Sequence, residues 1–69
     1  MFETIGYRVQ TSNDNRIGQS LSFKAAMDWA EEYSLLNCDV VVHVIASDAQ
    51  NNTEWKGTCL NGEWCLPNW

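Results

Sequence analysis

Basic residues are scarce in this chain of 69 residues, which carries four lysines and arginines against nine acidic residues and a formal net charge of -5. The cations, Arg8, Arg16, Lys24 and Lys56, are scattered along the sequence rather than clustered. Binding to nucleic acid or to an anionic membrane requires a basic surface that neutralises phosphates. We therefore expect no direct contact with either. A protein with a basic surface is the better electrostatic match.

Long apolar runs are also missing, since no stretch approaches the length that crosses a bilayer. Residues 1–10 lack the charged and apolar regions of a signal peptide. The three cysteines are an odd number, and none forms a Cys-x-x-Cys pair, which fits a reducing compartment. These features predict a cytoplasmic protein.

Metal ligands are few and poorly spaced. The chain has four soft ligands, the number that a closed zinc site requires: Cys38, His43, Cys59 and Cys65. Neither Cys38-x4-His43 nor Cys59-x5-Cys65 has the spacing of a zinc finger, and an antiparallel hairpin would turn Cys59 and Cys65 to opposite faces. We expect no metal, no disulfide and no other cofactor.

Catalytic motifs are equally absent. The four glycines are isolated, so no loop resembles a phosphate-binding loop. His43, the single histidine, falls in the middle of an expected strand, where a tolerated sheet residue is commoner than a general base. The chain is therefore not expected to be an enzyme.

One segment has the periodicity of an α-helix. Its apolar residues follow the spacing of a single helix face: Phe23, Ala26, Met27 and Ala30, widened by Ala25, Trp29 and Tyr33. Ser22 is a suitable N-cap, because its hydroxyl can accept from a free backbone N–H of the first turn. We expect a helix from Ser22 to Leu35, followed by Asn37 in a left-handed conformation.

Strand-forming residues lie on both sides of this helix. Alternation predicts a first strand at 5–10, and the valine-rich segment 40–46 predicts an interior strand. Segment 17–21 either forms a short return strand or leads directly into the helix. Asn61-Gly62 predicts a type I′ hairpin between 53–60 and 63–67. The fold class is therefore α+β, a single domain over residues 1–69 with an antiparallel sheet of three to four strands and one helix packed on one face, in the order β(β)αβββ.

The expected hairpin fixes which side chains share a face. The register pairs Leu60 with Glu63, Cys59 with Trp64, Thr58 with Cys65 and Gly57 with Leu66. The face that should meet the helix carries Trp55, Cys59, Trp64 and Leu66. The other face carries Lys56, Thr58, Leu60, Glu63 and Cys65.

Two surfaces remain as candidate binding sites. Asp28, Glu31 and Glu32 form an acidic helix face, which is either ordinary solvated surface or a patch for a basic partner. Val41, His43 and Ile45 are expected on the sheet face away from the helix, where apolar side chains favour a partner or homodimer interface as much as ordinary surface.

Several segments together carry a family resemblance. They are the strand at 5–10, the alanine-rich helix opened by Ser22, Cys38 before a valine-rich strand, and the closing Asn61-Gly62-Glu63-Trp64 hairpin. This pattern resembles small phage-encoded proteins, including some anti-CRISPR inhibitors of type I systems. The resemblance implies an inhibitor that binds a subunit of a CRISPR surveillance complex in the host cytoplasm. Because this chain is acidic, such an inhibitor is expected to cover a basic nucleic-acid-binding surface. The alternative is a homodimerising structural module.

Overall fold

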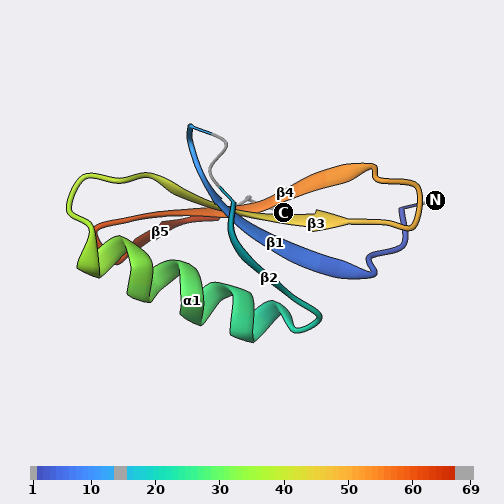
Figure 1. The fold of residues 1–69 in the computed structure, drawn as a ribbon, viewed down its shortest axis with the longest axis horizontal. Helices are drawn as coiled ribbons and strands as arrows, with labels where there is room; N and C mark the ends of the chain where they lie inside the picture. The colour runs from blue at the N-terminus through green and yellow to red at the C-terminus, as the bar shows by residue number, and fades with distance from the viewer. Residues whose placement is uncertain (1, 14–15, 67–69) are drawn as a thin grey trace.

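The computed structural model describes residues 2–13 and 16–66. Its elements are β1 (Gly6–Thr11), β2 (Arg16–Ser20), α1 (Phe23–Leu36), β3 (Val42–Ser47), β4 (Thr53–Leu60) and β5 (Glu63–Cys65). The strands form one antiparallel sheet in the order β2-β1-β3-β4-β5. The helix α1 crosses one face of this sheet (Figure 1). The α+β class and the single covering helix are confirmed, but the sheet has five strands rather than three to four.

The additional strand is β2. For this segment the sequence analysis allowed two alternatives, a short return strand or a direct connection to the helix. β2 pairs with β1 from Tyr7–Ser20 to Gln10–Arg16, with an irregularity between Val9 and Gln10. The Ile17 side chain packs against the core. Gly18 lies beneath the indole ring of Trp29, where a β-carbon would overlap the ring. The segment therefore becomes a strand because its apolar residue and its glycine both fit beneath α1.

The helix begins as the sequence predicts. The Ser22 hydroxyl accepts a 3.3 Å hydrogen bond from the Ala25 N–H, as an N-cap should. The prediction for Asn37 is wrong, because this residue closes the helix with a φ of -125°. The left-handed conformation falls instead on Asp39, with a φ of 66°. The turn into β3 therefore bends two residues later than expected.

The core lies between α1 and the middle of the sheet. It consists of Val9, Ala26, Ala30, Val42 and Val44, all fully buried. Small alanines on the helix allow it to approach the valines of β1 and β3 closely. Phe23 and Trp29, expected in the core-facing stripe, lie at its edges with 36% and 42% of their surface exposed. Phe23 nevertheless packs on Tyr7, with 5.2 Å between the ring centroids.

The C-terminal hairpin adopts the predicted turn and register. Asn61 and Gly62 have φ values of 51° and 83°, as a type I′ turn requires. The expected pairs of Leu60 with Glu63, Cys59 with Trp64 and Thr58 with Cys65 are all present. Trp64 packs against the core as predicted, and the Leu66 side chain lies over Gly57 on the same side. The end expected at Pro67 lies outside the described residues.

Trp55 is the exception on this hairpin. The sequence places it beneath the helix, but the register between β3 and β4 shifts by one residue between Val44 and Ile45. Val44 pairs with Gly57, whereas Ile45 pairs with Trp55. An extra residue in one strand reverses the facing of every residue beyond it. Trp55 therefore points to the face opposite α1 and is 42% exposed.

The polar turn between β3 and β4 is organised by Asp48. Its carboxylate accepts hydrogen bonds from the Gln50 and Asn52 backbone N–H groups, at 2.9 and 2.8 Å, and from the Asn52 side-chain amide at 3.0 Å. Only 7% of the Asp48 surface is exposed. The hydrogen bonds, led by that from the Asn52 side chain, outweigh burial and lower the pKa of Asp48 below its ordinary value.

Candidate functional site

The three predicted acidic residues lie on or beside the outward surface of α1. Asp28 and Glu32 are exposed, and Glu31 is half-buried at the flank. Asp28 forms an ion pair with Lys24 across one helical turn, at 3.2 Å. Within residues 2–13 and 16–66, neither Glu31 nor Glu32 forms an ion pair. The helix surface therefore keeps an excess of negative charge.

Large apolar side chains lie among these carboxylates. Trp29 is 42% exposed, Leu35 is 64% exposed and Leu36 is 75% exposed. Spacings of three, four and seven residues place them on the same side of the helix as Asp28 and Glu32. We call this set, Asp28, Trp29, Glu32, Leu35 and Leu36, the outer face of α1. The sequence analysis identified the charges of this face but did not include Leu35 and Leu36, which come after the last residue of the predicted core stripe.

The second predicted group lies on the opposite side of the sheet. Val42, Val44 and Ala46 of β3 are buried towards α1, so alternation turns Val41, His43 and Ile45 to the other face, where each is half-buried. We call this side the open face of the sheet. The structure thus brings Val41, His43 and Ile45 together, but separates them from the acidic helix by the thickness of the sheet. A single flat partner surface cannot contact both groups.

A hydrogen-bonded cluster occupies the centre of the open face. The Trp55 Nε1–H donates to the Thr58 hydroxyl oxygen at 2.8 Å, and the same oxygen lies 2.8 Å from Nδ1 of His43. His43 is therefore a paired sheet residue with a hydroxyl neighbour. Sequence reasoning missed this cluster, because without the register shift Trp55 and Thr58 would lie on opposite faces.

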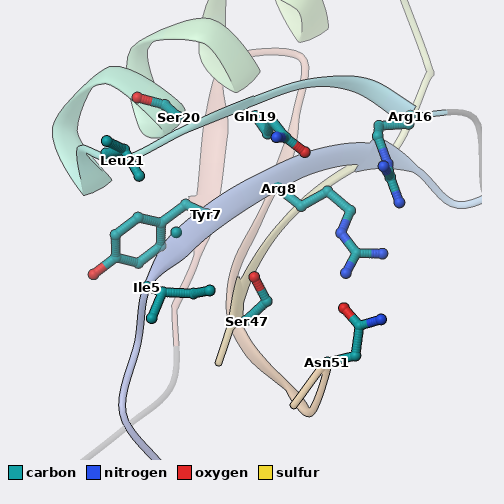
Figure 2. Close-up of a pocket in the computed structure, with 10 residues that line it drawn as sticks. Ile5, Tyr7, Arg8, Arg16, Gln19, Ser20, Leu21, Ser47 and Asn51 are labelled. Atoms are coloured by element: carbon teal, nitrogen blue, oxygen red, sulfur yellow. The ribbon is translucent and has the colours of Figure 1, made fainter. Parts of the chain in front are cut away.

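A cavity of about 440 Å³ lies at the end of the sheet formed by β1, β2 and the turn after β3. It is lined by Ile5, Gly6, Tyr7, Arg8, Arg16, Gln19, Ser20, Leu21, Ser47 and Asn51. Figure 2 shows the Arg8, Arg16 and Asn51 side chains reaching towards the same space. These two cations, which are separated in the sequence, therefore lie at one place in the fold. Antiparallel pairing of β1 with β2 brings two arginines together that lie eight positions apart in the chain.

The cysteines do not converge. Cys59 is buried and its register partner is Trp64, whereas the exposed Cys65 pairs with Thr58 on the open face. Cys38 is exposed within the turn after α1. Among the described residues, no three His, Cys, Asp or Glu side chains are grouped in a way that would hold a metal ion.

Comparisons with protein-family models, curated proteins and solved structures give no match to this chain. In the described part of the chain, α1 is too short and too polar to cross a membrane. The described residues thus offer three candidate binding surfaces: the outer face of α1, the open face of the sheet and the arginine-lined cavity.

Proposed function

We propose that this protein is a small acidic inhibitor that binds another protein through the outer face of α1. The observation that carries this proposal is the mixture of carboxylates and exposed large apolar side chains on one helix face. Protein interfaces combine apolar anchors, which supply most of the affinity, with charges that guide the encounter. Leu36 fits the role of an anchor, together with the exposed part of Trp29. Asp28 and Glu32, with Glu31 at the flank of this face, fit the role of guiding charges.

The charge of this face favours a partner with a basic surface. Basic protein surfaces are commonly those that bind nucleic-acid phosphates. A protein that covers such a surface would compete directly with nucleic acid. We therefore propose inhibition by occlusion, with no chemical step. The resemblance to phage-encoded inhibitors suggests a specific form, in which the target is a subunit of a type I CRISPR surveillance complex and DNA binding is lost.

The direct test measures binding of target DNA by a purified surveillance complex in the presence of this protein. We expect the protein to reduce DNA binding in proportion to its concentration, and added salt to weaken the inhibition. The Asp28→Asn/Glu31→Gln/Glu32→Gln variant removes the charges while keeping side-chain size, so it should inhibit at least about tenfold less well. Leu36→Ala truncates an apolar side chain that is 75% exposed and should lose a comparable amount through its anchor.

The matched control is the Glu3→Gln/Glu54→Gln/Glu63→Gln variant, which removes the same number of charges outside the helix. It should inhibit as well as the parent. Equal loss in both triple variants would mean that net charge alone acts, and the outer face of α1 would be rejected as the site. DNA binding that stays unchanged at saturating parent protein would rule out the CRISPR target.

A second candidate function is favoured by the open face. Trp55 and Leu60 are 42% and 39% exposed there, beside the half-buried Val41 and Ile45. A two-fold symmetric dimer would cover these side chains and make the protein a structural module. Sedimentation equilibrium separates the two proposals, because a stable dimer that Ile45→Glu dissociates supports the module. A monomer at all concentrations contradicts it.

A further inference from the structure

Charge is distributed unevenly around the cavity at the end of the sheet. Arg8 of β1 lies opposite Gln19 of β2, and Arg16 lies opposite Gln10, so the two arginines are diagonal neighbours across this strand pair. Both line the cavity. Neither forms an ion pair with a carboxylate within residues 2–13 and 16–66. Half of the positive charge of an acidic chain is thus concentrated at one concave place.

The polar side chains around the arginines add further hydrogen-bond donors that suit an anion. Gln19 and Asn51 contribute side-chain amides, and Ser47 contributes a hydroxyl. All three can donate hydrogen bonds to an anion. Among residues 2–13 and 16–66, no carboxylate side chain lines the cavity. The acidic outer face of α1 lies on the other side of the sheet, so its charges are separated from the cavity by packed protein.

We propose that this cavity binds the phosphate group of a small phosphorylated molecule. An arginine presents a planar fork of N–H donors that suits both carboxylate and phosphate. One fork can saturate a carboxylate, whereas a terminal phosphate has oxygens for two guanidinium groups and carries more charge. The presence of two arginines therefore favours phosphate. The volume of about 440 Å³ lies within the range of small-molecule sites.

The opposite rim of the cavity gives a place for the rest of the ligand. Ile5 and Leu21 line this rim and are 55% and 87% exposed. Apolar surface beside a charged group suits a ligand with a phosphate at one end and an apolar or planar body at the other, such as a nucleoside monophosphate. This site is independent of the proposed inhibitor surface, because it uses a different face and the opposite charge.

The test is a two-dimensional NMR titration of the intact chain with inorganic phosphate, adenosine monophosphate, adenosine and citrate. We expect saturable shifts of the Gln19 and Asn51 side-chain amides with phosphate and with adenosine monophosphate. The monophosphate should bind more tightly than phosphate because it also covers the apolar rim. Adenosine should bind at least about tenfold more weakly than the monophosphate, since it lacks the group that the arginines recognise.

Three single variants make the test specific. Arg8→Gln and Arg16→Gln should each weaken binding of adenosine monophosphate by about 10- to 100-fold. Lys24→Gln removes the same charge from the helix and should leave affinity unchanged. The dispersion of the backbone spectrum checks that each variant remains folded. The site would be rejected by linear, non-saturating shifts or by equal weakening in all three variants. Binding of citrate without phosphate would overturn the assignment of the ligand.

Discussion

The backbone N–H of Gly62 donates a 3.0 Å hydrogen bond to the hydroxyl oxygen of Ser34, which lies 28 positions earlier in the chain. The Ser34 hydroxyl is fully buried, donates to the Glu31 carbonyl at 2.8 Å and lies 3.1 Å from the sulfur of Cys59. With the Cys59 thiol as donor, every hydrogen-bonding position of the hydroxyl is used. A single side chain thus ties the last turns of α1 to the β4–β5 hairpin.

Ser34→Ala is therefore expected to destabilise the protein. The substitution leaves the Gly62 N–H without its acceptor in a partly buried place, which costs about 1–3 kcal/mol of the free energy of unfolding. Urea denaturation followed by circular dichroism measures this loss. The control is Ser12→Ala at an exposed position, which should change stability by less than about 0.5 kcal/mol. Equal stability of the two variants would show that the buried hydroxyl contributes nothing.

A second hydrogen-bonded link joins Asp39 and Asn61, the two non-glycine residues with left-handed conformations at this end of the described chain. The Asn61 side-chain oxygen accepts from the Asp39 N–H at 2.9 Å, and its amide donates to the Asp39 carboxylate at 3.2 Å. Asn61→Gly keeps the turn but removes both bonds, so we expect a loss of about 1 kcal/mol. Asn61→Ala should lose about 1 kcal/mol more, because its β-carbon disfavours a positive φ. Thermal unfolding measures both losses. Equal destabilisation by Asn61→Gly and Asn61→Ala would refute the role given to the positive φ.

The contact of Gly18 with Trp29 makes a third position sensitive. A β-carbon at Gly18 would overlap the indole ring, so Gly18→Ala must displace the ring or the strand. Overpacking of this kind costs about 1–3 kcal/mol. Gly6→Ala is the matched control on the neighbouring strand, since its β-carbon would meet its nearest atom at 3.6 Å, an ordinary contact. Urea denaturation gives the stabilities, and the indole N–H resonance of Trp29 should move only in Gly18→Ala.

The local features of this fold are encoded in short stretches of sequence. The Ser22 cap, the turn at Asn61-Gly62 and the alternation along β3 each depend on neighbouring residues, and all three appear where the sequence predicts them. Features that depend on distant pairing were missed. The shift at Val44 and Ile45, which moves Trp55 to the open face, depends on how two strands meet.

The candidate sites also differ in whether they depend on neighbouring residues or on distant strand pairing. The charges of the outer face of α1 follow from helical spacing, so the sequence located them. The meeting of Arg8 with Arg16 requires β2, the strand that was left open, and the turn that carries Asn51. Isolated polar residues in separate segments carry no local signal of a shared cavity. The two arginines can be placed together from the sequence only if residues 16–20 are predicted to pair with β1.

The lowered pKa of Asp48 predicts how stability depends on acid. A carboxyl group whose pKa is lower in the folded than in the unfolded chain stabilises the fold fully above its ordinary value of 3.8. That stabilisation is lost as the pH falls through the lower pKa of the folded state. Asp48→Asn cannot titrate, and it replaces Oδ2, the acceptor of the Asn52 side-chain amide, by an NH₂ donor. We expect it to be less stable than the parent at about pH 6 and to approach the parent as the pH falls below 3.8 and through the lower pKa of the folded state, in urea denaturation. Asn52→Ala removes the largest cause of the lowered pKa and should reduce the acid-dependent loss while keeping the carboxylate. If the parent and Asp48→Asn lost stability in parallel as the pH falls, protonation of the Asp48 carboxylate would not contribute to the loss of stability in acid.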